Sequence, residues 1–185
     1  MDSRKINSIL NDNLEIIVDT REKENKHILQ FFQNHNVKYE KEKLDTGDYA
    51  ARLINTESGF IFPAVVERKA SVNEIIGNML EKKDENRRLR IEREFERAAN
   101  CNRDVYMIVE EENGLNNISS GKYRSELNCK AALGKFLTWN AMYTKGTTFC
   151  SKANTGFYIY KILYYAARNY MKWGFIDGYD SDKQN

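Results

Sequence analysis

Two acidic side chains and a lysine near the middle of the chain have the types and the order of a metal-dependent site that hydrolyses phosphodiesters. Asp48 follows a glycine, and Glu67 and Lys69 lie at the end of the apolar-to-charged segment 65–69. Mg²⁺ is held by one or two carboxylates together with phosphate oxygens of the substrate, and a neighbouring ammonium group can orient or polarise an attacking water. These residue types therefore predict a site for Mg²⁺ or Mn²⁺.

The segment 65–69 has the pattern of a buried strand with a charged end. Side chains alternate between the faces of a strand, so Glu67 and Lys69 share one face and Arg68 points to the other. Taken alone the pattern is weak, because a solvated strand end with a surface ion pair would look the same. Asp48 could likewise simply begin a turn.

Two further acids strengthen the metal hypothesis. Asp19 and Glu22 lie just past the end of a predicted first strand. If that strand is a neighbour of the later ones, the strand ends bring Asp19, Glu22, Asp48 and Glu67 into one small volume beside Lys69. Like charges at that density are costly unless a divalent cation neutralises them.

Strand and helix signals alternate along the chain, which predicts an α/β fold with a mixed central sheet and helices on both faces. The predicted strands cover residues 15–19, 37–44, 48–54, 60–68, 105–109 and 147–150, and the predicted helices cover residues 27–34, 72–80, 84–99, 123–143 and 155–173. The third and fourth strands form a hairpin, and Pro63 indicates that its second arm begins irregularly or lies at an edge.

Length and composition predict one domain over residues 14–177, between a flexible leader, 1–13, and a flexible tail, 178–185. Hydrophobic residues make up 41% and charged residues 30%, with no apolar run long enough to cross a bilayer. The three cysteines are widely spaced, which argues against a zinc site or a disulfide framework. We expect a soluble cytoplasmic protein, associated with the nucleoid if it is bacterial or viral. The net charge of +2 means that any basic surface must be local.

Several motifs occur here in the order known from one nuclease family. Gly47-Asp48 is followed by Glu67-Arg68-Lys69 and then, three residues on, by Asn73; upstream stands Asp19-Thr20-Arg21-Glu22. In this order the chain resembles the nuclease domain of the XPF-type structure-specific endonucleases. Their hallmark is Gly-Asp, a variable stretch, Glu-Arg-Lys, three residues and Asp, preceded by Asp-x-Arg-Glu. Residues 75–97 resemble the helix and arginine-bearing stretch that follow in that family.

The resemblance, which spans roughly residues 14–173, implies a restriction-endonuclease-like core. It implies hydrolysis of one strand of branched, flap or junction DNA with Mg²⁺ or Mn²⁺, in DNA repair or recombination. Asp48 and Glu67 would be the central metal ligands, with Glu22 as a further ligand. Asp19 and Glu22 would complete the acidic pocket, and Lys69 would be the catalytic lysine.

Two departures from the family pattern suggest alternatives. Asn73 stands where the family has aspartate, which keeps an oxygen ligand but loses its charge. This motivates a second hypothesis, a catalytically weakened relative that acts as a scaffold for DNA or a partner protein. The sequence also ends without the tandem helix-hairpin-helix domain usual in the family, which fits a compact nuclease of a phage or mobile element. A third hypothesis is a site-specific restriction-type nuclease on the same core.

Candidate DNA contacts come from basic residues and from one loop. Acids interleave with the arginines of segment 84–99, which favours a salt-bridged, solvated helix, but a role in phosphate binding stays open. A loop is predicted at residues 113–121 and is available to DNA. The arginines proposed to bind DNA are Arg68, Arg87, Arg88 and Arg90.

The last predicted helix, residues 155–173, carries more aromatic side chains than one buried face needs. Core packing is the first interpretation. A homodimer interface is the rival, because tyrosine and tryptophan are favoured at interfaces, and base stacking is the third. His27 and His35 are interpreted as a surface pair without a role.

Overall fold

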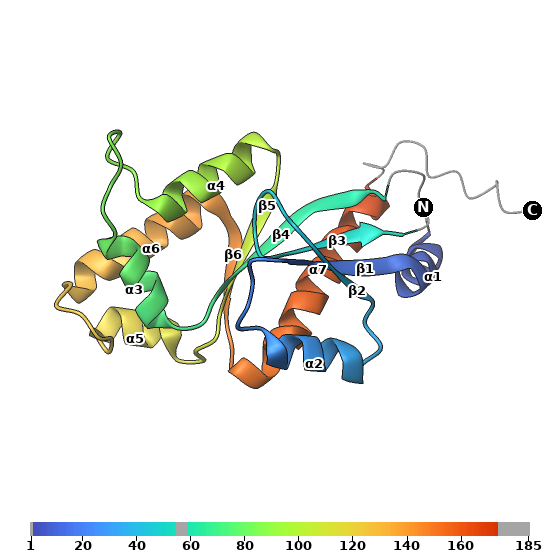
Figure 1. The fold of residues 1–185 in the computed structure, drawn as a ribbon, viewed down its shortest axis with the longest axis horizontal. Coiled ribbons are helices and arrows are strands. Elements are labelled where there is room, and N and C mark those ends of the chain that lie inside the picture. Colours follow the sequence, from blue (N-terminus) through green and yellow to red (C-terminus); the bar gives the residue numbers. More distant parts are fainter. Residues whose placement is uncertain (1, 55–58, 174–185) are drawn as a thin grey trace, which may run out of the picture.

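The computed structural model describes residues 2–54 and 59–173, and the predicted tail at 178–185 lies outside this range. Its centre is a six-stranded sheet with the order β2-β1-β3-β4-β5-β6 (Figure 1). The β1–β2, β4–β5 and β5–β6 pairs are parallel, and β1–β3 and β3–β4 are antiparallel. The strands are β1 Leu14–Asp19, β2 Tyr39–Glu42, β3 Tyr49–Leu53, β4 Ile61–Lys69, β5 Asp104–Val109 and β6 Thr144–Phe149.

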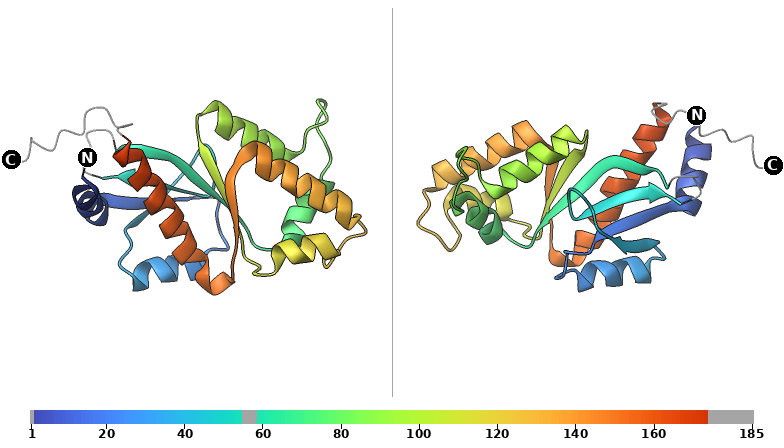
Figure 2. Two further views of the ribbon diagram at one scale, coloured as in Figure 1. Left: turned by 180° about the vertical axis from the view of Figure 1, so that it is seen from behind. Right: turned by 45° about the horizontal axis from the view of Figure 1, so that its top comes forward.

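Helices cover both faces of this sheet, as the two views of Figure 2 show. Helices α1, α2 and α7 pack on the face that carries Ile16, Val18 and Ile108, and α3 to α6 pack on the face that carries Ile17 and Met107. The alternation of neighbouring residues between the two cores follows from the two-residue period of a strand. The described helices are α1 Ser3–Asn13, α2 Lys26–Asn34, α3 Val72–Leu80, α4 Arg90–Asn100, α5 Gly114–Ser120, α6 Cys129–Tyr143 and α7 Thr155–Lys172. The predicted mixed α/β fold is confirmed.

Strand β4 is central rather than peripheral, since it lies between β3 and β5. Its pairing with β3 shifts register between Ala50 and Arg52, so the hairpin is irregular near Pro63. Of the two interpretations of Pro63, the irregular start is the one that the structure shows.

The prediction of a loose leader at residues 1–13 is wrong for its helical part. Ser3–Asn13 forms α1, and its Ile6 and Leu10 side chains are buried in the core beneath α7. The Arg168 Nε atom of α7 also donates a hydrogen bond to Asn7 Oδ1, at 2.9 Å. The leader is therefore part of the folded unit.

Replacing Leu10 with alanine should destabilise the protein by about 2–4 kcal/mol, because Leu10 is 1% exposed and its removal leaves a cavity. In thermal unfolding this corresponds to a fall in Tm of about 5–15 °C. Ser8→Ala, on the exposed face of the same helix, is the matched control. An unchanged Tm for Leu10→Ala would mean that α1 does not contribute to the core.

Several elements differ from the predictions, most clearly two helix starts and one predicted loop. Helix α4 begins at Arg90 rather than at residue 84, because Arg87 has a φ of +61° that an α-helix does not allow. Helix α6 begins at Cys129 rather than at residue 123, where the Asn128 side chain caps the backbone N–H groups of residues 130 and 131. Residues 113–121, predicted as a loop, contain the short helix α5.

None of the helices within residues 2–54 and 59–173 has the length and apolar character needed to span a membrane.

Candidate active site

The backbone around Asp48 joins the strands that carry the candidate site. The Asp19 N–H donates to Asp48 O, and the Asp48 N–H donates to Val66 O, both at 2.8 Å. Gly47, with a φ of +74°, allows this close approach, since a Cβ atom at residue 47 would lie 2.9 Å from the Cβ of Val65. The Gly-Asp pair thus fixes Asp48 against the charged end of β4.

Asp48 and Glu67 line one cavity, of about 190 Å³, on the side of the sheet covered by α4. Its remaining walls are mostly charged or polar and come from the loops after β1 and before β3 and from α4. They include Arg21, Asp45, Thr46, Arg90, Glu94 and Arg97. Asp48, just before β3, and Glu67 of β4 therefore converge beside a cluster of arginines. The sequence predicts that these two acids come together.

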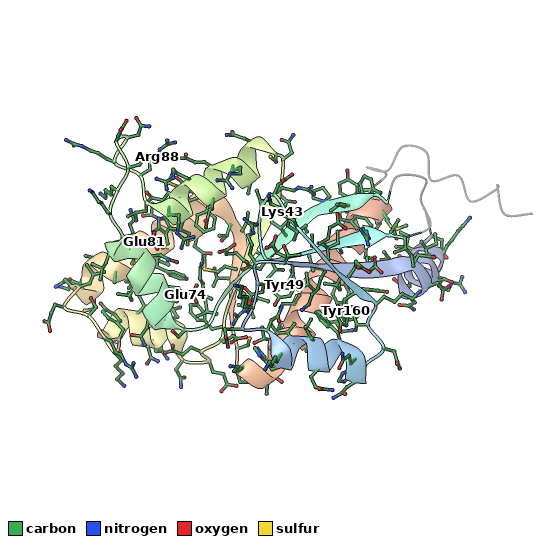
Figure 3. All side chains as sticks on the ribbon, viewed as in Figure 1. Lys43, Tyr49, Glu74, Glu81, Arg88 and Tyr160 are labelled. Carbon is green, nitrogen blue, oxygen red and sulfur yellow. The ribbon has the colours of Figure 1, made fainter. Side chains whose placement is uncertain are left out.

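Lys69 is buried beside this cavity. Its Nζ atom lies 2.8 Å from Glu67 Oε1 and 3.4 Å from an oxygen of Glu74, which Figure 3 labels on α3. Burial alone would lower the pKa of Lys69, but the charge and hydrogen bond of Glu67, with the charges of Glu74 and Asp48, raise it. This environment therefore favours the protonated, cationic form of the Lys69 side chain.

For Asp48, in contrast to Lys69, the surroundings disfavour the charged form of the side chain. Burial, then the charges of Glu67 and Glu22, raise its pKa well above the ordinary value, against the hydrogen bond that Arg68 N–H donates to Asp48 Oδ2 at 2.8 Å. The shift means that the ionised carboxylate lacks a sufficient counter-charge in the protein alone. A bound cation would supply that charge.

Asp19 is placed differently from the prediction, because its carboxylate does not line the cavity. It accepts hydrogen bonds from Arg21 N and Nε at 2.8 Å, from Arg21 Nη2 at 3.0 Å and from Leu44 N at 2.7 Å. Burial would raise the pKa of Asp19, but the bonds to Arg21 and Leu44 outweigh it and lower the pKa. Asp19 therefore holds Arg21 and the start of the 44–48 turn.

Glu22 and Arg68 form a buried ion pair behind the cavity. Arg68 Nη2 lies 2.6 Å from Glu22 Oε1, and Arg68 Nη1 lies 3.0 Å from Glu110 Oε2, while His27 Nε2 contacts Glu110 Oε1 at 2.6 Å. The Arg68 side chain is only 6% exposed, so its guanidinium is engaged inside the protein rather than presented to DNA. His27, interpreted above as a surface residue without a role, belongs to this network.

Glu110 was missed in the sequence analysis although its position gives a signal. It directly follows the apolar strand β5, just as Asp19 and Glu67 follow the apolar residues of β1 and β4. Acidic residues at the carboxyl ends of neighbouring strands meet at one edge of the sheet, which is where Glu110 lies.

The predicted DNA-binding arginines fall into separate environments. Arg88, labelled in Figure 3, pairs with Asp84 and Glu96, and Arg87 is exposed in the turn before α4; neither lines the cavity. Arg90 does line it, although it also pairs with Glu94 at 2.8 Å.

Arg97 was not among the predicted contacts, yet it lines the cavity from the same face of α4 as Arg90. Among the described residues it has no ion pair. The seven-residue spacing of the two arginines is the sequence signal that places them on one side of a helix. Arg97 is therefore the cavity arginine whose charge is available to a ligand.

Asn73, the departure from the family motif, does not line the cavity. Its Oδ1 atom accepts a hydrogen bond from Arg124 N at 2.7 Å, which ties α3 to the segment before α6. The side chain at this position thus has a structural partner of its own.

The donor set fits a hydrated Mg²⁺ or Mn²⁺ ion. In the described part of the chain no group of three or more His, Cys, Asp and Glu side chains forms a complete metal cage. Asp48 and Glu67 instead face one cavity, and the carboxylate of Asp48 lacks a sufficient counter-charge. Mg²⁺ commonly takes only one or two carboxylates, with waters and substrate phosphates as its other ligands.

The mixed sheet, covered by helices on both faces, is the α/β architecture of a restriction-endonuclease-like domain. Residues 18–162 match the ERCC4 domain, and the chain belongs to this family. The fold is similar to that of XPF from Aeropyrum pernix, with a TM-score of 0.58 and 17% identity over 85% of this chain and 69% of that chain. No curated protein sequence matches the chain. Family and fold together support a nuclease of the XPF family and confirm the predicted resemblance.

Proposed function

We propose that this protein is a Mg²⁺- or Mn²⁺-dependent endonuclease that hydrolyses phosphodiester bonds in branched, flap or junction DNA. One observation carries the proposal: Asp48, just before β3, and Glu67 of β4 line one cavity with arginines, beside the buried ammonium of Lys69. Metal ligands, a fixed cation and phosphate-binding groups are the parts that this hydrolysis needs.

Each residue has a distinct role in this proposal. Asp48 and Glu67 hold the cation, which when bound supplies positive charge at the scissile phosphate and lowers the pKa of the attacking water. Glu67 fixes Lys69 through their 2.8 Å contact, and the ammonium orients the water and remains protonated. Asp19 positions Arg21, and Glu22 is a positioning residue through its pair with Arg68 rather than a metal ligand.

Arg21, Arg90 and Arg97 contact the phosphates of the bound DNA. They line the same cavity as the two acids, and Arg97 is the one without an ion-pair partner in the described part of the chain. Arg68, Arg87 and Arg88 do not line the cavity, so we do not assign them this contact.

Replacing Arg97 with alanine should weaken binding of flap DNA and lower the slope of log K against log salt by about 1, because one phosphate contact is lost. Fluorescence anisotropy in EDTA at several salt concentrations measures both quantities. Arg4→Ala is the control, since that side chain is 97% exposed and lies outside the cavity. An unchanged salt slope for Arg97→Ala would remove Arg97 from the DNA interface.

Cleavage mapping tests the function itself. Labelled flap, fork and plain duplex DNA are incubated with Mg²⁺, with Mn²⁺ and with EDTA, and we expect metal-dependent nicks near the branch point. Sequence-defined double-strand breaks in plain duplex would instead identify a restriction-type nuclease. Absence of cleavage on every substrate, together with no Mn²⁺ binding by calorimetry, would contradict the proposal and favour a scaffold.

Dimerisation through α7 stays a prediction. The helix buries Ile159, Leu163 and Ala167 in the core, as the packing interpretation requires. Tyr165, at 53% exposed, lies outside that buried stripe and is available to a second copy. Sedimentation of the wild type and of Tyr165→Ala tests this.

A further inference from the structure

A second cavity, of about 300 Å³, lies between α1, α2 and α7, on the opposite face of the sheet from Asp48 and Glu67. We call it the α7 pocket. Its walls combine aromatic and basic side chains with aliphatic and amide ones, and Tyr160 of α7, labelled in Figure 3, is one of the aromatic residues. The residues that matter here are Phe31, His35, Lys38, Phe157, Tyr160 and Lys161.

Lys161 is held by aromatic rings rather than by an acid. Its Nζ atom lies 5.8 Å from the ring centroid of Phe157, 5.4 Å from that of Tyr160 and 5.9 Å from that of Tyr164. Such cation–π contacts hold an ammonium group without neutralising it. Among the described residues no carboxylate pairs with Lys161, so its charge is available to an anion in the pocket.

The opposite wall adds a second cation and a fixed ring. Lys38 Nζ donates to Asp12 O at 2.5 Å, which places the ammonium while leaving further N–H groups. The His35 ring stacks on Phe31, with centroids 4.1 Å apart and an interplanar angle of 23°, and its Nδ1 atom is 2.9 Å from Phe31 O. The described lining of the pocket contains no aspartate or glutamate, so its electrostatic potential favours an anion.

The exposed rings favour an anion that is attached to a flat group. Phe157 is 42% exposed, and Phe31 meets it edge to face at 6.4 Å. Bases of single-stranded nucleic acids stack on such rings while lysines bind the adjoining phosphates. A volume of about 300 Å³ is at the small end for ligand sites, which suits one nucleotide rather than a longer segment.

We propose that the α7 pocket binds one nucleotide of a single-stranded DNA arm, with the base against Phe157 and Tyr160 and the phosphate at Lys161 and Lys38. The choice of DNA as the ligand rests on the proposed function. The pocket adjoins residues 37 and 38, which lead into the edge strand β2, at the strand ends opposite Asp19. In this proposal the arm passes around that edge of the sheet. The pocket therefore selects substrates that have a single-stranded arm over plain duplex.

Binding of labelled oligothymidylate to the full chain, measured by anisotropy in EDTA to prevent cleavage, tests the pocket. Lys161→Glu should weaken binding about tenfold, and Phe157→Ala should do so by a similar factor, since one stacked base contributes on this scale. Lys161→Arg should keep most of the affinity. The matched control is Lys172→Glu, the same change on the same helix at a lysine that also lies over a ring, Trp173, but outside the pocket.

A competition experiment distinguishes a nucleotide from a free phosphate as the ligand of the α7 pocket. Thymidine monophosphate should displace the oligonucleotide, while inorganic phosphate at the same concentration should not, because phosphate alone has no ring to stack. Amide chemical shifts should change at residues 35–38 and 157–161 when thymidine monophosphate is added. Circular dichroism establishes that Lys161→Glu is folded.

Three outcomes would overturn the inference. The first is an equal loss of oligonucleotide affinity in Lys161→Glu and Lys172→Glu, and the second is a set of amide shift changes confined to the region of Asp48 and Arg97. The third is sedimentation as a dimer that Lys161→Glu dissociates, because the pocket would then be an interface between copies. Failure of cleavage with every metal would instead contradict the proposed function while leaving nucleotide binding intact. The two failures are therefore distinguishable.

Discussion

Asp48→Asn should lower the rate of DNA cleavage roughly a thousandfold in Mg²⁺ or Mn²⁺, because it removes one of the two cavity carboxylates that are proposed to hold the metal. The amide can still accept the hydrogen bond from Arg68 N–H, so the local backbone is kept. Single-turnover cleavage of a labelled flap measures the rate, and calorimetry should show that Mn²⁺ binding is lost with it.

The stability of Asp48→Asn separates a chemical defect from unfolding. Burial and the charges of Glu67 and Glu22 raise the pKa of Asp48 in the folded protein, so the folded state favours the protonated carboxyl. Above that pKa, the ionised Asp48 costs the folded state free energy, and a neutral amide removes this cost. The Tm of Asp48→Asn in EDTA should therefore equal or exceed that of the wild type.

Asp104→Asn is the matched control for cleavage, since Asp104 begins β5, away from the cavity, and its ion pair among the described residues is an exposed one with Lys145. Its rate should stay within about threefold of the wild type, as expected for a surface pair. If Asp48→Asn cleaves as fast as this control, Asp48 does not take part in the reaction.

The convergence of Asp48, Glu67 and Lys69 was predictable because it depends on local rules. The β3–β4 hairpin brings Asp48 beside Val66, and the two-residue period of a strand places Glu67 and Lys69 on one face. The directions in which the Asp19 and Glu22 carboxylates point were not predictable in this way. Each carboxylate is turned by an arginine partner, and whether an acid faces a metal or an arginine depends on three-dimensional packing.

Among the helices, too, some starts were predictable from the local sequence and others were not. The capped start of α3 follows from Ser71 and Glu74, and the structure shows the cap, with the Ser71 side chain accepting from Glu74 N. The start of α4 is set by the left-handed backbone at Arg87, which residue type alone does not reveal. Helix α1 did carry a signal, since Ile6, Ile9 and Leu10 have helical spacing, but its polar composition outweighed that signal in the prediction.

The largest stability effect is expected for Arg68→Ala. Arg68 is the cation between Glu22 and Glu110, whose side chains are 12% and 2% exposed. Removing one partner of a buried ion pair leaves uncompensated charge and costs about 3–5 kcal/mol. Thermal unfolding should show a fall in Tm of about 6–20 °C for a chain of this size.

Arg52→Ala provides the comparison, because Arg52 also joins two acids, Glu15 and Glu42, but is 22% exposed at the sheet surface. Water screens its partners, so the loss there should be about 1 kcal/mol or less. The double variant Arg68→Met with Glu110→Gln should recover part of the stability, since it removes one of the stranded charges as well as the arginine. If Arg68→Ala unfolds at the same temperature as Arg52→Ala, the buried network does not stabilise the edge of the sheet that carries the candidate site.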